Sequence, residues 1–317
     1  MKKKILIISI VFILVILITF RFIISFYRMP NQTMEDTIKK GDLLVINKLA
    51  GGDFFMGLKM PAFSNFKTGD IVYFLDPSDV DVPLYERKRI VARIIACPGD
   101  DYLMHLRDVF INDVLYEEPP TVKHSYRVVA NEGAKLDSAF FLKYGLSEWV
   151  KESSSSSIHD KYKVMYGMTE EKPIDFFDIP MSKEQSLEVE QDSLISYVRM
   201  VRARTPGRLI RTWPFSPYWF WNRWDTKYSF QIPGKGILVP ITYRTLGAYE
   251  DIIEEYEGNT IDANLDNQIF INNQRVNGYT VRENYYLVLS DNRDRFYDTR
   301  TWGLVPEKYI IGKVINK

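Results

Sequence analysis

The sequence is poor in the residues that build disulfide frameworks and metal centres. It has one cysteine, Cys97, and its three histidines, His105, His124 and His159, have no ligand-like spacing. A single cysteine excludes an intramolecular disulfide framework and a thiolate metal cluster. Cys97 follows an apolar run and has no paired histidine, so we expect a small core residue and not a nucleophile. Neither a metal nor a cofactor is expected.

The chain has no excess of charge of either sign. Its 41 lysines and arginines balance 41 aspartates and glutamates, which gives a formal net charge of zero at pH 7. Because basic patches mark proteins that bind nucleic acid, no nucleic-acid partner is expected. A length of 317 residues with 46% hydrophobic residues is enough for one large or two modest domains.

One long apolar run is present, at the N-terminus. Residues 5–20 are apolar apart from two hydroxyl residues, and residues 22–27 extend the run past Arg21. The whole run reaches the roughly 20 residues that a helix needs to cross a bilayer. It is longer than the apolar part of a cleavable signal and ends in large residues, so we favour an uncleaved, single-pass anchor. Three lysines precede it, which predicts a cytoplasmic N-terminus and an extracytoplasmic (periplasmic) bulk from about Met29.

Short apolar runs cut by Gly, Asp and Pro predict β-strands on both sides of a mixed middle part. The predicted strands are residues 43–46, 71–75, 90–96, 109–111 and 285–289. A shared Phe-Ile-Asn pattern in residues 109–113 and 269–273 predicts hairpin strands that end in Asn turns. Residues 51–65 predict a surface loop. Its apolar side chains either face a membrane or fold back on the core; they are Phe54, Phe55, Leu58 and Met60.

The middle of the chain has a different character. Residues 132–151 and 182–200 predict helical or mixed structure, and the serine run 153–157 predicts a loop tip. Nothing near those serines would activate a nucleophile. Aromatic residues crowd the stretch from Trp213 to Phe230, where we favour a buried mini-core over an interface.

Four motifs lie at the two ends of this pattern. The first runs from Gln32 to Lys48 and the second from Gly69 to Phe74, whereas the third runs from Arg93 to Asp100. The fourth includes Asp291-Asn292-Arg293, Asp298-Thr299-Arg300, Trp302-Gly303 and Ile311-Gly312-Lys313. Together they resemble the signature boxes of the bacterial type I signal peptidases, membrane-anchored serine peptidases that remove signal peptides with a Ser/Lys dyad.

The resemblance implies a mainly β fold. We expect a signal-peptidase-like coiled antiparallel β-sheet core with an inserted α+β domain, preceded by one N-terminal transmembrane helix. The expected division is 1–28 for the tip and anchor, 29–100 with 282–317 for the core, and 101–281 for the insert. The implied partners are the lipid bilayer and the signal peptides of exported preproteins, met at the outer face of the cytoplasmic membrane.

The two dyad positions depart from the family pattern. Thr33 stands where the family has its nucleophilic serine, and Ala92 stands where it has the general-base lysine. Thr33 keeps a hydroxyl, but its methyl restricts χ1, and Ala92 has no group that accepts a proton. Further departures are Asp36 for a proline, Ser290 for the usual glycine, and Phe296 for a serine that helps to hold the dyad.

No lysine close to Ala92 in the sequence is an obvious substitute for the general base. Lys88 lies four residues before Ala92, which is about 13 Å along a strand, and Lys48 fills a family position without a base role. The resemblance implies that the matching residues support the site structurally; they are Met34, Arg93, Asp291, Asn292, Arg293, Asp298 and Arg300.

These departures leave alternative functions. The favoured hypothesis is a catalytically degenerate member that binds preproteins or pairs with an active signal peptidase paralogue. The alternative is an active peptidase that uses Thr33 with a relocated base. A third hypothesis, a structural anchor protein of the envelope, is unrelated to peptide handling.

Overall fold

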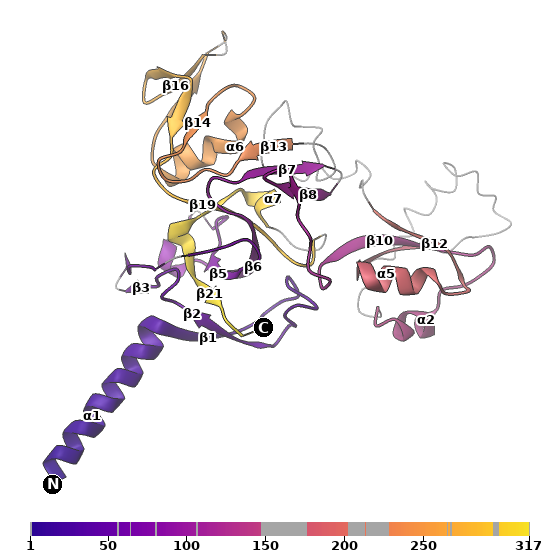
Figure 1. Ribbon diagram of the computed structural model, residues 1–317, viewed down its shortest axis with the longest axis horizontal. Coiled ribbons are helices and arrows are strands. Elements are labelled where there is room, and N and C mark those ends of the chain that lie inside the picture. Colours follow the sequence, from indigo (N-terminus) through magenta and orange to yellow (C-terminus); the bar gives the residue numbers. More distant parts are fainter. Residues whose placement is uncertain are drawn as a thin grey trace.

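An apolar helix projects from the N-terminal end of the folded part (Figure 1). The computed structural model describes residues 2–55, 57–63, 65–79, 81–105, 107–146, 176–201, 213, 228–264, 266, 268–293 and 298–316. Helix α1 (Lys2–Ile18) continues into a π-helical turn, η1 (Thr19–Ile23). Residues 3–23 form a 21-residue segment that is long and apolar enough to cross a membrane.

The helix ends earlier than the apolar run does. We expected helix to about Tyr27, but Ile24–Arg28 form strand β1, which pairs antiparallel with β2 (Leu43–Asn47). The backbone N–H of Lys48 also donates to the carbonyl of Ile23 (2.8 Å). β-Branched and aromatic residues such as Ile24 and Phe26 favour a strand once a partner strand satisfies their backbone groups. The helix therefore passes directly into the core sheet.

The core sheet draws its strands from both ends of the chain (Figure 1). Its seven strands have the order β1-β2-β21-β5-β6-β19-β20, and their pairings are antiparallel. The further members are β5 (Ile71–Leu75), β6 (Arg89–Ala96), β19 (Tyr285–Leu289), β20 (Val305–Pro306) and β21 (Ile310–Val314). The strands predicted at 43–46, 71–75, 90–96 and 285–289 are all present. The mainly β fold is confirmed.

The central strands are apolar on both faces because each face covers a different core. Tyr285, Leu287 and Leu289 of β19 enter one apolar cluster, together with Tyr249 and Ile253. The alternating residues Tyr286 and Val288 enter a second cluster, which contains Met34, Ile38 and Ala92. Since side chains alternate across a strand, a sheet covered on both faces reads as a continuous apolar run.

Several smaller sheets adjoin the core. β13 (Tyr228–Gln231), β7 (Asp101–His105), β8 (Asp108–Ile111) and β9 (Val114–Leu115) form one sheet, and β14 (Leu238–Pro240) pairs with β18 (Gly278–Thr280). β15 (Ile261–Ala263), β16 (Ile269–Ile271) and β17 (Gln274–Val276) form another, beside α6 (Leu246–Asp251) and the π-helical η3 (Ile252–Tyr256).

Both predicted Asn turns are present. Asn112 and Asp113 connect β8 to β9, and Asn272 and Asn273 connect β16 to β17. All four residues have positive φ, between 49° and 65°. Two successive residues with positive φ give the tight hairpin turn that Asn and Asp tolerate.

A separate sheet lies to the side of the core (Figure 1). It has the order β11-β10-β12, from β10 (Lys123–Ala130), β11 (Phe176–Ser182) and β12 (Ile195–Met200), and carries α2 (Ser138–Lys143) and α5 (Lys183–Glu190). Its apolar core is its own, and includes Phe140, Phe141 and Val189. The stretch from 182 to 200 is thus mixed, as predicted. The serine run 153–157 and residues 147–151 lie outside the described residues.

Other expectations have mixed outcomes. The loop predicted at 51–65 contains a short hairpin, β3 (Phe54–Phe55) and β4 (Leu58–Lys59). Trp213 and Phe230 are buried and pack edge to face with ring centroids 5.2 Å apart, which agrees with a mini-core, whereas the aromatic side chains between them lie outside the described residues. The remaining short elements are η2 (Leu84–Glu86), α7 (Thr299–Trp302) and η4 (Glu307–Tyr309).

Candidate functional site

Thr33 lies in a closed loop between β1 and β2. The ends of this loop are joined by hydrogen bonds from Met29 N to the carbonyl of Asp42 (2.9 Å) and from Gly41 N to the carbonyl of Met29 (2.8 Å). Thr33 is only 6% exposed, and its hydroxyl donates to Asn31 Oδ1 over 2.8 Å. An amide oxygen is not a base at neutral pH, so this contact does not activate the hydroxyl as a nucleophile.

Ala92 lies in the middle of β6, opposite Val72 of β5, and is 1% exposed. It belongs to the same apolar cluster as Met34, which follows Thr33 and is fully buried. The dyad positions therefore border one core. Apolar side chains surround Ala92, the position at which the resemblance noted above implies a lysine.

The lysines that could be considered as substitutes have other contacts. Lys48 Nζ donates to the carbonyl of Arg21 (2.5 Å) and lies 3.1 Å from Asp53, at the foot of the helix. Lys88 is exposed ahead of β6. Burial lowers the pKa of Lys59 to about 8, but its ammonium donates to the carbonyl of Ile310 (2.6 Å).

A buried ion pair joins the third motif, which contains Arg93, to the fourth, which contains Asp291. Arg93 donates from Nε to Asp291 Oδ1 (2.9 Å) and from Nη2 to Asp291 Oδ2 (2.6 Å), and from Nη1 to the carbonyl of Gly69 (2.9 Å). Thr37 Oγ1 donates to Asp291 Oδ2 over 2.5 Å. Asp291 is fully buried and Arg93 is 5% exposed. Because the pair is bidentate and desolvated, it fixes the Thr37 side of the loop against β6.

A second buried pair organises the last motif. Arg300 Nε and Nη2 bind Asp298 over 2.8 and 2.7 Å, and Asp298 caps α7 through the N–H of Arg300 (3.1 Å). Ser290, the residue at the usual glycine position, donates its N–H and its hydroxyl to Asp298 Oδ2, each over 3.2 Å. This substitution is therefore accommodated by an additional hydrogen bond. Phe296 lies outside the described residues.

Asn292 and Arg293 connect the Thr33 loop to the segment from Glu118 to Lys123. Asn292 N donates to the carbonyl of Thr33 (2.9 Å), and Arg293 Nε donates to Glu118 Oε1 (3.0 Å). Burial would raise the pKa of Glu118, but the charge of Arg293 and a 2.6 Å contact with His124 lower it to about 2. Glu118 is therefore a carboxylate at neutral pH, and neutralises Arg293.

Sequence reasoning missed Lys123, the first residue of β10. Its ammonium lies 2.9 Å from Asp36 Oδ2, and its side chain is 5% exposed. Asp36 has φ +70°, which proline cannot adopt. The one sequence feature that pointed to this contact was the aspartate at position 36, where the family pattern has proline. No sequence pattern around Lys123 connects it with the first motif.

Comparison with known families now gives the assignment. The model of the family described as "Signal peptidase, peptidase S26" matches residues 2–173 and 239–316, well over half of the chain. The chain belongs to the signal peptidase family. The Signal peptidase I of Buchnera aphidicola subsp. Baizongia pistaciae (strain Bp) is 50% identical over 42 residues. That alignment spans 13% of this chain and 14% of the relative.

Because the chain belongs to this family, the loop around Thr33 is the candidate functional site. The structure brings together Thr33, Asn292 and Lys123 through backbone hydrogen bonds, and it places Ala92 in the apolar core beside Met34. It also groups the matched charged residues into two buried clusters around Asp291 and Asp298. Among the residues that the structure describes, no group of three or more His, Cys, Asp and Glu could hold a metal.

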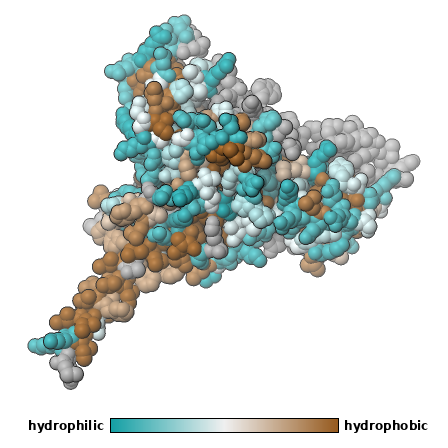
Figure 2. Space-filling model, viewed as in Figure 1, coloured by the Kyte–Doolittle hydropathy of each residue, from teal (hydrophilic) through white to brown (hydrophobic). Residues whose placement is uncertain are grey.

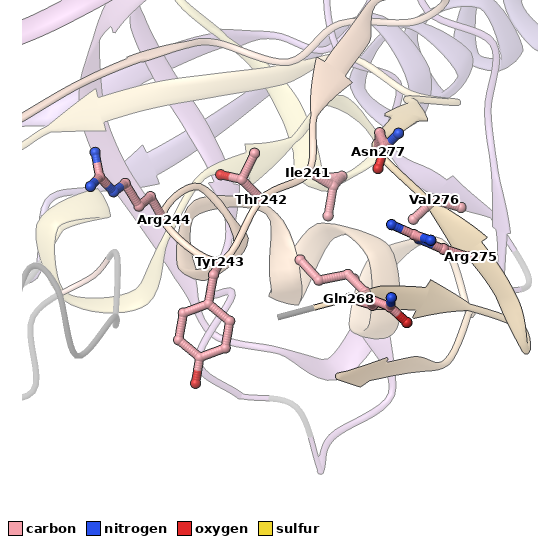
Figure 3. A pocket seen from close by; sticks show the side chains of 9 residues that line it. Ile241, Thr242, Tyr243, Arg244, Gln268, Arg275, Val276 and Asn277 are labelled. Carbon is pink, nitrogen blue, oxygen red and sulfur yellow. The ribbon is translucent and has the colours of Figure 1, made fainter. Parts of the chain in front are cut away.

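This signal peptidase family member also has a pocket, which is formed by other residues (Figure 3). Its volume is about 510 Å³, and its lining includes Ile241, Tyr243, Gln268 and Arg275. These residues come from the segment after β14, from the position just before β16 and from β17, and the pocket contains none of the matched site residues. It is therefore separate from the Thr33 site.

Proposed function

We propose that this protein acts on signal peptides of exported preproteins at the outer face of the cytoplasmic membrane, as a catalytically degenerate member of its family. The observation that carries the proposal is the apolar burial of Ala92 in β6. No proton acceptor stands at that position, and the Thr33 hydroxyl is bonded to an amide oxygen instead. Without a base in hydrogen-bond reach, a hydroxyl is a poor nucleophile.

The proposed role keeps the part of the site that positions a peptide. The paired residues Arg93 with Asp291 and Arg300 with Asp298 hold the Thr33 loop and the last motif in place. Buried bidentate pairs are costly to desolvate, so they are better suited to fixing a geometry than to adding stability. We therefore propose that Asn292, Arg293 and Met34 act with them as structural support of a peptide site that has lost its chemistry.

We also propose that the protein is a single-pass membrane protein with a cytoplasmic N-terminus. The lysines before the helix favour this orientation. Figure 2 shows apolar surface continuing from the helix onto the adjoining part of the core. Five large apolar side chains near the helix are 41 to 79% exposed; they are Phe26, Leu43, Phe55, Leu58 and Phe63. Phe54 and Met60 are half-buried, so of the four loop residues considered above Phe55 and Leu58 are the candidates for lipid contact.

The domain division belongs to the same proposal. Residues 1–28 would be the tip and anchor, 29–100 with 282–317 the core, and 101–281 the insert. Because β1 lies within 24–28, the anchor unit would contribute one strand to the core sheet.

A cleavage and binding assay tests the proposal. The detergent-solubilised full chain is mixed with a secretory preprotein, beside an active family member on the same substrate, and products are followed by gel and mass spectrometry. We expect no cleavage but measurable binding of a fluorescent signal peptide. Thr33→Ala should leave that binding unchanged, since the hydroxyl has no catalytic task in this proposal. A preprotein that neither binds nor is cleaved would favour the envelope-anchor hypothesis.

One observation favours the alternative, an active peptidase with a relocated base. The Lys123 amine is brought to the Thr33 loop, although it is held there by Asp36. Cleavage after a small-x-small motif that is lost in Thr33→Ala would establish this alternative. If the protein instead pairs with an active paralogue, its addition should change the rate of that enzyme in the same assay.

A further inference from the structure

The ion pair between Asp36 and Lys123 links the Thr33 loop to the insert. Lys123 Nζ lies 2.9 Å from Asp36 Oδ2, with side-chain exposures of 5% for the lysine and 33% for the aspartate. Asp36 stands three residues after Thr33, and Lys123 is the first residue of β10. A nearly buried ammonium requires compensation by a nearby anion, which here comes from the loop that carries the nucleophile position.

The backbone at Asp36 has a conformation that most residues avoid. Its φ of +70° lies in the left-handed region, where Asp and Asn are tolerated far better than most residues. Proline, the residue of the family pattern at this position, has φ fixed near about −65°. The loop therefore has a turn that the family residue could not form, and the turn directs a carboxylate at Lys123.

Further contacts surround the ion pair. The strand-like segment 291–293 lies between the loop and Lys123: Lys123 N donates to the carbonyl of Asp291 (2.8 Å), and Arg293 N donates to the carbonyl of Lys123 (3.0 Å). From the other edge, Asn292 N donates to the carbonyl of Thr33 (2.9 Å). The Asp36–Lys123 ion pair joins the Thr33 loop directly to Lys123, past residues 291–293. Thr37 Oγ1 lies 2.6 Å from Thr121 Oγ1 and makes a second link to the same part of the insert.

We propose that Lys123 is a positioning residue, which holds the turn at Asp36 and so keeps Thr33 and Asn292 in register for a bound signal peptide. The start of the insert is then one wall of the peptide site. The effect on signal-peptide binding rests on the proposed function. The positioning of the turn itself is measured separately.

The first measurement is hydrogen exchange of the loop in the full chain in detergent. The amides of Thr37 and Ile38 both donate to the carbonyl of Met34 (3.0 and 2.7 Å), so they report on the turn around Asp36. Asp36→Asn keeps a residue that tolerates positive φ and removes the charge, and Lys123→Met keeps an apolar stem of similar length. We expect exchange at these amides to become at least about threefold faster in either variant, because local opening sets the exchange rate.

A double-mutant comparison separates a specific pair from general damage. If the two residues act through each other, Asp36→Asn with Lys123→Met should be no worse than either single variant. Lys123→Arg should restore exchange close to that of the wild type. Lys143→Met is the matched control, because it breaks another lysine–aspartate pair, with Asp192, in which the lysine side chain is 61% exposed. Unchanged exchange in both single variants, or additive effects, would overturn the positioning role.

The second measurement is the affinity for a fluorescent signal peptide. The apparent Kd equals the intrinsic Kd divided by the fraction of molecules with the competent turn, so a variant in which this fraction falls to about one third has a Kd raised about threefold. We expect a rise of that size or more in both single variants. Lys123→Arg should bind as the wild type does. Faster exchange with unchanged affinity would make the pair merely structural and refute the inference. If the wild type binds no signal peptide, the proposed function fails, while the exchange data still decide whether the pair holds the turn.

Discussion

Restoring the dyad is the sharpest test of how much of the peptidase site persists. The change is Thr33→Ser with Ala92→Lys. Ala92 is 1% exposed in a packed strand, so the larger side chain should cost about 1–3 kcal/mol of stability. For a folded part of this size, that lowers the melting temperature by about 2–4 °C per kcal/mol. Burial should also lower the pKa of the new lysine below its usual value, which is the condition for a neutral amine base.

The assay compares preprotein cleavage by this variant with cleavage by Thr33→Ala with Ala92→Lys, which carries the same packing cost without the nucleophile. General-base catalysis is worth about 10²- to 10⁴-fold, so we expect at least about 100-fold more cleavage than from Thr33→Ser alone, which has the nucleophile but no base. The variant without the nucleophile should not cleave. Because only the neutral amine accepts a proton, the rate should rise with pH through the lowered lysine pKa. If the variant folds but does not cleave, the proposal that the peptide site is otherwise intact is refuted. Adding Phe296→Ser then tests whether that departure is the obstacle.

Two further predictions concern the buried charges. Asp291→Asn leaves Arg93 buried without its counterion, and breaking such a pair should cost about 3–5 kcal/mol, measured by thermal unfolding. Lys143→Met removes a lysine whose side chain is 61% exposed and should lower the midpoint much less; equal effects would contradict the argument. Glu118 has a folded-state pKa of about 2 against an ordinary 4.5, so its contribution is fully present above about 4.5 and is lost as the pH falls toward 2. Glu118→Gln should therefore flatten the acid limb of stability against pH, and an unchanged limb would disprove this role.

The strands of the core could be predicted because their sequence pattern has few alternatives. Residues 71–75 and 285–289 are short apolar runs bounded by turn residues, and both are buried strands. Residues 24–28 could not be separated from the helix before them, since the apolar run continues through Phe26 and Tyr27 into this partly exposed edge strand. Only the pairing with β2 distinguishes them, and that pairing is a tertiary contact.

The candidate site was predictable in part. The motif pattern located Thr33, Ala92 and the charged residues around Asp291, because their spacing is local within each motif. It could not supply Lys123, whose contact with Asp36 depends on how the insert meets the loop. Nor could it indicate the positive φ at Asp36, since Asp is also common in ordinary turns.

The direct passage from helix to sheet has a practical consequence for making a water-soluble version of this protein. A truncation that begins at Met29 would delete β1 and leave the backbone groups of β2 unpaired at an exposed edge. Such an edge is a template for association with other chains, and Leu43 of β2 is already exposed at it. A truncation that begins at Ile24 would retain the edge strand. It should remain monomeric at concentrations where the shorter fragment aggregates.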